Sequence, residues 1–300
     1  MVSISSAKKI KERAGAFFKS EITIEAFDQN QVKRIKKFLK NEYNLIPDKE
    51  RIGKGMVYIT KHVSKKLYQY LKEIQYKEKN EQKFIDLIFS IIELFEKAKD
   101  HDLLRFGIHF ASNFSLDYFN TLISKIKSWA NNGHWEIREN AQYPMLAGLK
   151  KFRNDALEIL DKWAESGNKN IRRFVAESLR PKTMVKWLRD PKENDQVLSI
   201  LTKLRFDDSI YVRKAVGNNL KDLSKYMPEK ILNLIDEWLK EKDNLNEKEQ
   251  NNLMWIVYQA LRWLKKKETK YHAQIEEMVG KNYLLYFDEK RNRWAKPPKK

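Results

Sequence analysis

The sequence contains no cysteine and few residues that break helices. Because no Cys occurs among 300 residues, a disulfide scaffold and a thiolate metal site are both excluded. Only 9 Gly and 7 Pro are present, while charged residues make up 34% of the chain. This profile is typical of long helices with solvated faces and argues against a β protein. The lack of cysteine is also consistent with a reducing compartment.

Long hydrophobic runs are missing as well. No window approaches the ~18 consecutive apolar residues of a transmembrane helix, and the N-terminus lacks the apolar core of a signal peptide. No lipid-anchoring motif occurs either. We therefore expect a soluble cytoplasmic protein, associated with a prokaryotic-type nucleoid, that has no membrane partner.

Acidic residues are scarce relative to basic ones. The chain has 41 Asp and Glu against 60 Lys and Arg, which gives a formal net charge of +19. Lys and Arg that contact phosphates release counterions and dominate affinity for nucleic acid, so nucleic acid is the expected partner. The alternative is that an AT-rich genome enriches lysine and that the charge binds nothing.

A helical motif recurs through the second half of the chain. An aromatic residue in the first three copies and a leucine in the fourth closes one helix, a short polar turn follows, and eight positions later an aliphatic residue opens the next helix. The first three copies lie 34 residues apart and a fourth follows after 41; the pairs are Phe95 with Leu103, Trp129 with Ile137, Trp163 with Ile171, and Leu204 with Val212. A period of this size predicts an all-α fold, a right-handed α-solenoid of HEAT-like helical repeats. The closing aromatics are most simply core residues between repeats.

The pattern also suggests a domain organisation. Residues 1–80 are strongly basic and show no repeat, and we expect a helical region there that packs on the solenoid. The repeat domain is expected over 81–288, with Pro144 interrupting one helix and Pro228 opening another. Residues 289–300 are rich in Lys and Arg and are expected to form a flexible basic tail.

Positive charge is repeated in phase with the motif. An arginine stands beside each helix opener or one place later: Arg105, Arg138, Arg172 and Arg213. Cations at helix N-termini oppose the helix dipole, so Arg172, Arg173, Arg213 and Lys214 at two successive helix starts need a reason. An anion that spans both starts would supply one, because free backbone N–H groups already favour phosphate there. The alternative is that these side chains cap neighbouring turns.

Three acids stand out against this basic background. The stretch 168–225 holds fourteen Lys and Arg against seven Asp and Glu, and two of those acids, Glu177 and Asp222, lie on successive helices. Glu136 lies in the turn of an earlier repeat. Because the helices of a solenoid lie side by side, the three carboxylates could converge. Ordinary ion pairing with nearby cations is the alternative reading.

Two runs in this region resemble a known family. They are Asn170-Ile-Arg-Arg-Phe-Val-Ala-Glu-Ser-Leu-Arg-Pro-Lys182 and Asp208-Ser-Ile-Tyr-Val-Arg-Lys-Ala-Val-Gly-Asn-Asn-Leu-Lys-Asp-Leu-Ser-Lys225. Together they are similar to the signature of the HEAT-like DNA alkylation-repair glycosylases (the AlkC/AlkD-like superfamily), and the AlkC branch is closest. The chain departs from that pattern at Ser178 and Leu179, at Gly217, where Ala is common, and at Asn219, where His is usual.

The resemblance implies a DNA glycosylase that hydrolyses the N-glycosidic bond of alkylated, cationic purines such as 3-methyladenine or 7-methylguanine. Its partner would be double-stranded DNA with alkylated bases, and it would need no cofactor or metal. We expect a monomer. The catalytic positions implied are Glu177, Asp222, Glu136 and Trp187, with Trp135 as a second candidate aromatic. The DNA-binding positions are Arg138, Arg172, Arg173, Arg180, Lys182, Arg213, Lys214, Asn218 and Lys225.

Two other functions remain open at this stage. A non-catalytic HEAT module would bind damaged or branched DNA without releasing a base, and a protein–protein scaffold is the commonest use of such arrays. No competing catalytic motif is present, because the five His residues show no metal-ligand spacing.

Overall fold

The computed structural model describes residues 3–24, 27–78, 80–182, 184–267 and 269–280, together with the strand residues 287–288 and 293–294. Its elements are almost all helices, and they group into two compact units, Met1–Phe152 and Arg153–Lys300. The all-α, HEAT-like helical-repeat prediction is thereby confirmed. None of the described helices combines the length and the apolar composition needed to cross a bilayer.

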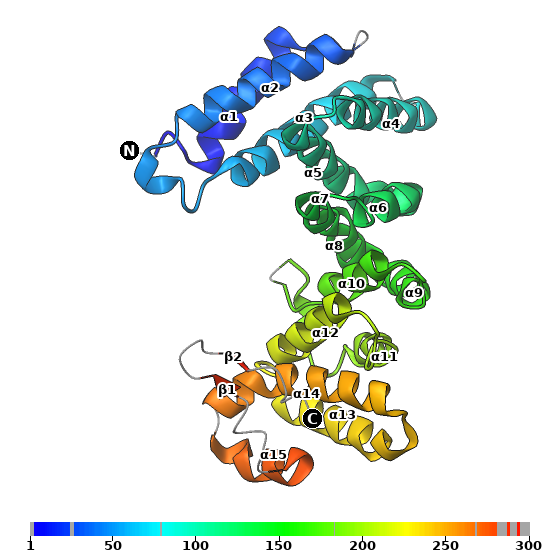
Figure 1. Ribbon diagram of the computed structural model, residues 1–300. Coiled ribbons are helices and arrows are strands. Elements are labelled where there is room, and N and C mark those ends of the chain that lie inside the picture. Colours follow the sequence, from blue (N-terminus) through cyan, green and yellow to red (C-terminus); the bar gives the residue numbers. More distant parts are fainter. Residues whose placement is uncertain are drawn as a thin grey trace. The chain divides into compact units, whose positions relative to one another are not determined.

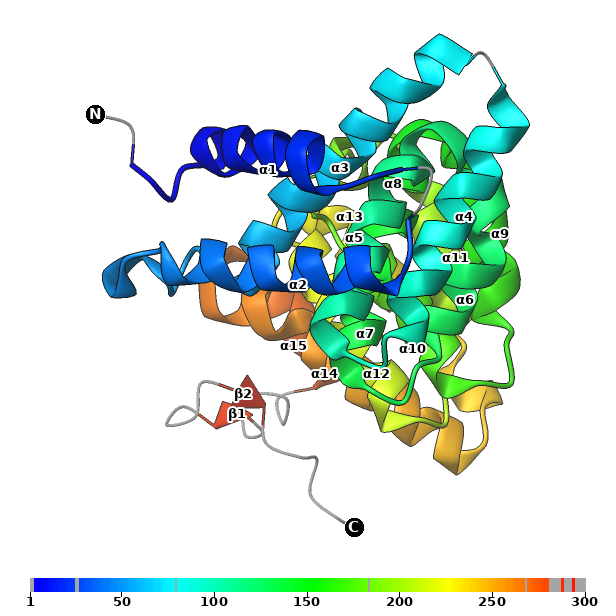
Figure 2. The same ribbon diagram turned by 90° about the horizontal axis from the view of Figure 1, so that it is seen from above.

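The first unit is built from helix pairs. Helix α3 packs on α5 and α5 packs on α8, while α4 covers α5 and α6 contacts both α7 and α8 (Figures 1 and 2). Helix α1 lies along α3. The helices are α1 (Ala7–Glu21), α2 (Gln29–Asn44), α3 (Met56–Glu78), α4 (Glu81–Lys97), α5 (His101–Tyr118), α6 (Ile123–Ala130), α7 (Trp135–Asn140) and α8 (Gln142–Lys151), with short 3-10 turns η1 (Asp48–Glu50) and η2 (Phe119–Leu122).

The second unit repeats the arrangement. Helices α10, α12 and α14 pack in succession as one layer, and α9 packs against both α10 and α11. The elements are α9 (Arg153–Ala164), α10 (Lys169–Ser178), η3 (Lys186–Arg189), α11 (Asp195–Thr202), α12 (Ile210–Leu223), α13 (Pro228–Lys240), η4 (Lys242–Asn244), α14 (Glu247–Lys267), η5 (Thr269–Tyr271), α15 (His272–Val279), and the antiparallel strands β1 (Phe287–Asp288) and β2 (Arg293–Trp294).

The aromatic residues that close the first helices are buried, as the repeat pattern predicts. Phe95, Trp129 and Trp163 are 0%, 2% and 7% exposed. The Trp129 indole donates a hydrogen bond to Glu96 Oε1 at 2.7 Å, which satisfies its one polar atom inside the core. These residues therefore hold the helix pairs together and are not available for chemistry.

Prolines and caps fix the helix boundaries. Asp100 and Asn168 accept backbone N–H bonds as N-caps of α5 and α10, and Pro228 occupies the first turn of α13 as expected. The interruption expected at Pro144 occurs three residues earlier, at Ala141 between α7 and α8. A proline ring clashes with the carbonyl four positions before it, so the break falls upstream of the proline.

The chain divides into its two units after Phe152, and α1 and α3 pack into the same unit as α5. The expected division into residues 1–80, 81–288 and 289–300 stays a prediction. The tail expected over 289–300 lies outside the described residues, apart from Arg293–Trp294 in β2.

Candidate functional site

Three of the four arginines that recur with the repeat clamp the turn that precedes their own helix, whereas Arg105 pairs with Asp102 and Glu136. Arg138, Arg172 and Arg213 each direct Nη1 at the carbonyl oxygen six residues earlier, in each case at 2.7 Å. Arg138 and Arg213 also reach the next carbonyl, at 2.9 Å. Helix ends leave carbonyl groups without partners, and a planar guanidinium can satisfy several of them at once. The turn-capping alternative is thus the observed arrangement for these three side chains.

Arg172 has a further internal partner. Its Nε and Nη2 bond to the two carboxylate oxygens of Asp207, at 2.5 and 3.1 Å, and the Asp207 side chain is only 4% exposed. Such a two-point contact holds the guanidinium in a fixed plane. Arg172 therefore ties the start of α10 to the turn before α12.

Glu177 and Asp222 come together in the second unit. Glu177 lies near the end of α10 and Asp222 near the end of α12, and Arg180 bridges them. Arg180 Nη1 bonds to Glu177 Oε2 at 3.0 Å, and its Nε and Nη2 both bond to Asp222 Oδ2, the former at 3.1 Å. We call these three residues the carboxylate cluster.

The two carboxylates differ in their environment. The Glu177 side chain is 7% exposed and also pairs with Arg173 Nη2 at 3.3 Å. The Asp222 side chain is 16% exposed and accepts Lys221 Nζ at 3.0 Å and Lys225 Nζ at 3.1 Å on Oδ1. Asp222 is thus the more accessible of the two acids.

Asp222 is ionised at neutral pH. Burial alone would raise the pKa of its carboxyl, but hydrogen bonds from Arg180 and Lys221 outweigh burial and lower the pKa to about 2. Burial in turn lowers the pKa of the Lys221 ammonium. The cluster therefore presents a permanent negative charge that is surrounded by cations.

Aromatic and amide groups surround the cluster. The Arg173 guanidinium lies 4.1 Å from the centre of the Tyr211 ring and donates to the Tyr211 carbonyl at 3.3 Å. On the next helix, α14, Arg262 Nη2 bonds to Asn218 Oδ1 at 3.3 Å. Asn219 Nδ2 bonds to the Ala176 carbonyl at 2.8 Å and holds α12 against α10. The α10–α12–α14 layer therefore carries both acids and most of the neighbouring cations.

The other predicted positions are distributed as follows. Lys214 and Lys225 are exposed, and Lys182 and Asn218 are half-buried. Trp187, in η3, is covered by the Arg153 guanidinium, whose Cζ is 4.0 Å from the ring centre, and Arg153 in turn pairs with Glu193.

Glu136 belongs to the first unit and lies in α7. It pairs with Arg105 Nη2 at 2.8 Å, and Arg105 also binds Asp102 at 3.1 Å. Its neighbour Trp135 is 64% exposed, which is unusual for so large an apolar side chain. The convergence of Glu136 with the other two acids stays a prediction.

Three residues near the cluster escaped the sequence-based prediction: Lys221, Tyr211 and Arg262. The contacts of Tyr211 and Arg262 depend on the register between helices. Arg180 reaches a residue 42 positions later and Asn218 one 44 positions later, and neither offset leads from Glu177 or Asp222 to Arg262. For Lys221 a signal was present, because it directly precedes Asp222 in the sequence.

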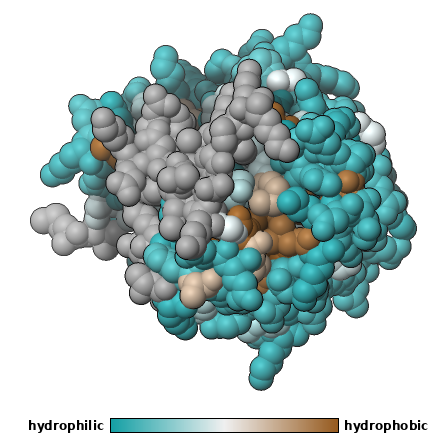
Figure 3. All heavy atoms as spheres, turned by 60° about the horizontal axis from the view of Figure 1, so that its bottom comes forward, coloured by the Kyte–Doolittle hydropathy of each residue, from teal (hydrophilic) through white to brown (hydrophobic). Residues whose placement is uncertain are grey.

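Hydrophilic residues dominate the described part of the face shown in Figure 3, with a limited hydrophobic area, drawn brown, among them. Among the described residues, no group of three or more His, Asp or Glu side chains is placed to hold a metal ion.

Known proteins share this fold. One of them is Pseudomonas fluorescens alkylpurine DNA glycosylase AlkC, which was solved bound to DNA containing an abasic site analog. The alignment with it has a TM-score of 0.51 and 21% identity, and it covers 89% of this chain and 65% of that chain. The alignment with AlkD2 from Streptococcus mutans has a TM-score of 0.52 and 21% identity, and it covers 77% of this chain and 97% of that chain. At this level of identity the likeness establishes the fold alone.

A sequence relative and a family model extend the comparison. The uncharacterized protein YhaZ of Bacillus subtilis (strain 168) is 36% identical to this chain over an aligned stretch of 113 residues. That stretch covers 36% of this chain and 29% of YhaZ. The chain therefore spans less than two thirds of both YhaZ and AlkC. The model of the DNA alkylation repair enzymes matches residues 64–264, most of the helical repeats and the whole carboxylate cluster. On that match, the chain belongs to the family of DNA alkylation repair enzymes.

Proposed function

We propose that this protein is a DNA glycosylase that removes N-alkylated purines, such as 3-methyladenine or 7-methylguanine, from duplex DNA as a monomer. Alkylation makes the base cationic, so the base can leave with the electron pair of the C1′–N bond without first being protonated. The sugar then acquires oxocarbenium character, as in glycoside hydrolysis, and water adds to C1′ and gives up a proton. A nearby carboxylate stabilises this positive charge.

The observation that carries the proposal is the pairing of Glu177 and Asp222 through Arg180. Asp222 is the more exposed acid and is ionised at neutral pH, so we assign it the electrostatic stabilisation of the sugar. Glu177 is nearly buried and holds Arg180 in place, which makes it a positioning residue. Glu136 and Trp187 keep their proposed catalytic roles as weaker candidates.

DNA contacts in this proposal come from cations with room to reach a phosphate. Lys214 is exposed and has no ion pair among the described residues, and Lys225 and Lys182 flank the carboxylate cluster. Arg180, Arg173 and Asn218 keep their proposed DNA-binding roles, with both arginines also bonded to acids of the carboxylate cluster. The turn-clamping arginines, Arg138, Arg172 and Arg213, contribute to the positive field while they hold the turns.

The test is release of methylated base from alkylated duplex DNA. Wild type should free methylpurine, and Asp222→Asn should lower the rate by about 100-fold or more, the scale typical of losing one electrostatic stabiliser. Glu177→Gln should have a smaller effect. Asp208→Asn is the matched control, because Asp208 is an exposed acid whose partner is Lys248. If wild type releases no base where a known glycosylase does, the proposal is wrong.

One observation favours a second candidate function. Both carboxylates are fully occupied by ion pairs, as expected for a module that binds damaged or branched DNA without chemistry. That function predicts strong, salt-sensitive DNA binding and no base release by wild type. A protein scaffold would instead show weak DNA affinity at physiological salt.

A further inference from the structure

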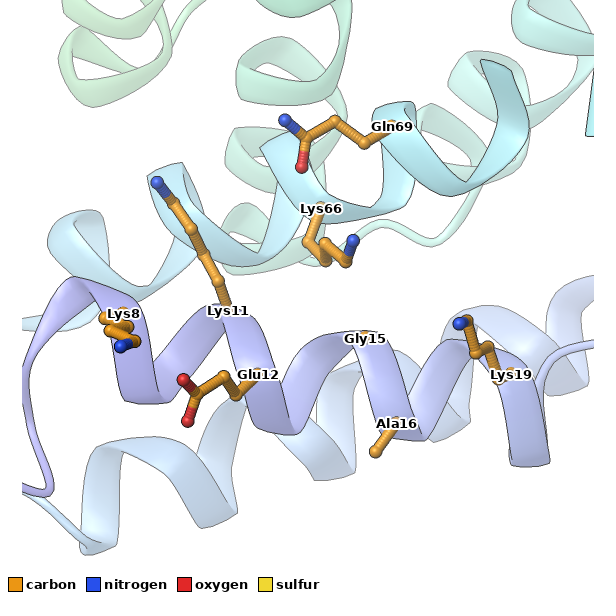
Figure 4. A pocket seen from close by; sticks show the side chains of 8 residues that line it. All are labelled: Lys8, Lys11, Glu12, Gly15, Ala16, Lys19, Lys66 and Gln69. Atoms are coloured by element: carbon orange, nitrogen blue, oxygen red, sulfur yellow. The ribbon is translucent and has the colours of Figure 1, made fainter. Parts of the chain in front are cut away.

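A lysine-lined pocket lies between α1 and α3, outside the carboxylate cluster. It has a volume of about 650 Å³ and is lined by Lys8, Lys11, Glu12, Gly15, Ala16, Lys19, Lys66 and Gln69 (Figure 4). Four of these eight residues are lysines and one is acidic. Figure 4 shows Lys11 of α1 and Lys66 of α3 reaching into the space between the two helices.

Gly15 makes room for one of these lysines. A Cβ atom at position 15 would lie 2.8 Å from Lys66 Cε, so the stem of Lys66 crosses α1 where α1 has no side chain. Glycine within a helix costs about 0.5–1 kcal/mol relative to alanine, so its place in the middle of α1 has a structural cost. The missing side chain at position 15 leaves room for the stem of Lys66, whose ammonium lies 3.9 Å from Glu73 Oε1.

The lysines at this pocket are crowded with like charge. Burial and then the neighbouring Lys65 and Lys61 lower the pKa of Lys11. Burial and the same three lysines lower the pKa of His62 to about 4, so this ring is neutral. Among the described residues, Lys11, Lys61 and Lys65 have no carboxylate within ion-pair distance, unlike Lys36, Lys54 and Lys72 elsewhere in this unit.

We propose that the pocket between α1 and α3, lined by Lys11 and Lys66, and the neighbouring exposed Lys61 and Lys65 of α3 together bind the phosphodiester backbone of DNA; we call this region the groove. The inference rests on DNA being the partner, as in the proposed function, and adds a second contact region in the other unit. Ammonium groups act as point charges for phosphate, and an anion among them would relieve their mutual repulsion. The groove lies largely outside the range matched by the family model, which begins at residue 64.

Binding of undamaged duplex DNA tests the groove separately from catalysis. The variant Lys11→Gln/Lys61→Gln/Lys65→Gln removes three positive charges. The matched control Lys97→Gln/Lys162→Gln/Lys240→Gln removes the same charge from lysines that pair with acids four residues earlier on their own helices. We expect the groove variant to weaken affinity about five-fold per lost contact near ~0.15 M salt, and to flatten the salt dependence by about 0.9 per contact. The control should change both values much less.

Chemical footprinting gives a readout on the wild-type protein itself. A lysine with a lowered pKa is more nucleophilic, so Lys11 should be acetylated readily by an amine reagent, and mass spectrometry can follow it peptide by peptide. Duplex DNA in phosphate-free buffer should protect Lys11 and Lys65 while Lys97 stays reactive. The groove variant should also melt no lower than wild type, because it loses like-charge repulsion.

The possible results separate the two proposals. If the groove variant binds duplex like the control, or if Lys11 is not protected, the groove inference is overturned whether or not base is released. Protection of Lys11 by inorganic phosphate but not by duplex would also overturn it, in favour of a small-anion site. Protection of Lys11 by DNA without base release would instead support the groove and refute the glycosylase.

Discussion

Arg180 is the residue on which the arrangement of the two acids depends. It binds Glu177 and Asp222 at once, and Glu177 is too buried for water to replace it. Removing one partner of a buried ion pair leaves an uncompensated charge, which is far more costly than losing an exposed pair. Stability and function therefore meet at one side chain.

We predict that Arg180→Ala lowers the free energy of unfolding by about 2–4 kcal/mol. Arg173 remains as a partner for Glu177, so the loss should stay below that of a fully orphaned carboxylate. Urea unfolding would measure it. The control is Arg34→Ala, which breaks an ion pair with both side chains more than half exposed and should cost less than about 1 kcal/mol. Equal losses in the two variants would contradict the bridging role.

Asp222 should also leave a signature in acid. Its pKa in the folded protein is lowered to about 2 from an ordinary 3.8, so its stabilisation is complete above about pH 4 and is lost as the pH falls toward 2. We predict that wild type exceeds Asp222→Asn in unfolding free energy by about 1–2 kcal/mol at pH 5, with allowance for partial solvent exposure. Urea midpoints at pH 5 and pH 3 would show the gap narrowing. A gap that is constant with pH would mean that the carboxylate is not held by its cations.

Sequence reasoning identified the acids but not their partners. Glu177 and Asp222 came from the family resemblance, and Arg180 lies close enough in sequence to Glu177 to be selected with it. Lys221, directly before Asp222 in the sequence, could have been chosen in the same way, but Arg262 could not, because its place depends on how α14 lies against α12. That register is set by core packing, which repeat spacing alone does not give.

At the scale of elements, the arginines at the helix starts can be explained either by turn clamping or by phosphate binding. If Arg172 serves the turn, a lysine there keeps the charge but loses the planar contacts with Asp207 and the Ser166 carbonyl. We predict that Arg172→Lys lowers stability by about 1–3 kcal/mol and leaves the salt dependence of DNA binding unchanged. Thermal unfolding and a salt titration would measure the two effects. Unchanged stability would contradict the turn-clamping role of Arg172.

Close contact between α12 and α14 explains one departure from the family pattern. A Cβ at Gly217 would lie 2.5 Å from the Cβ of Gln259 and 3.3 Å from the Ile256 carbonyl oxygen. Gly217→Ala should therefore push the two helices apart and destabilise the protein by about 1–3 kcal/mol, despite the better helix propensity of alanine.

Gly133→Ala serves as the control for this prediction. No atom lies within 4 Å of a Cβ built at position 133, so the change should be neutral or slightly stabilising. Differential scanning calorimetry of both variants would compare them. A Gly217→Ala variant as stable as wild type would show that α14 can shift without cost.

Helix boundaries were predictable to within a few residues wherever caps and prolines mark them. The start of α13 at Pro228 follows directly from the sequence. The break at Ala141 was misplaced, because the sequence marks the proline and the clash acts on an earlier carbonyl. The third and fourth copies of the motif lie 41 residues apart instead of 34, because the segment between α10 and α11 contains the additional turn η3. A periodic pattern could not predict the position of η3.

For the whole molecule, the dominant property is the excess of positive charge. A net charge of +19 predicts that DNA affinity falls steeply with salt. We predict that Lys182→Gln/Lys214→Gln/Lys225→Gln weakens duplex binding and flattens the salt dependence by about one unit per lost phosphate contact. Fluorescence anisotropy at several salt concentrations would measure this. The Lys97/Lys162/Lys240 variant is again the control, and equal slopes for both would place the DNA contacts elsewhere.

The fold class was predictable because the period was read over several copies, whereas the division into two units was not. Repeat spacing runs through residue 152 without a change in composition that would mark the boundary. The basic N-terminal helices likewise carry no repeat signal, yet α3 packs directly on α5. The packing between helices determines both the boundary between the units and the contact of α3 with α5. This packing depends on many residues at once and cannot be read from a single motif.

The turn clamp has a consequence for how such a chain can change in length. Each guanidinium bonds to a carbonyl only six residues earlier, so every helix pair contains the arginine that satisfies the carbonyls of its own turn. Extra residues can enter between two pairs, as they do around η3, without leaving a carbonyl unsatisfied in the neighbouring turns. Duplication or loss of a whole helix pair therefore leaves every remaining turn with its own arginine. Duplication of only part of a pair would separate a turn from the arginine that clamps it.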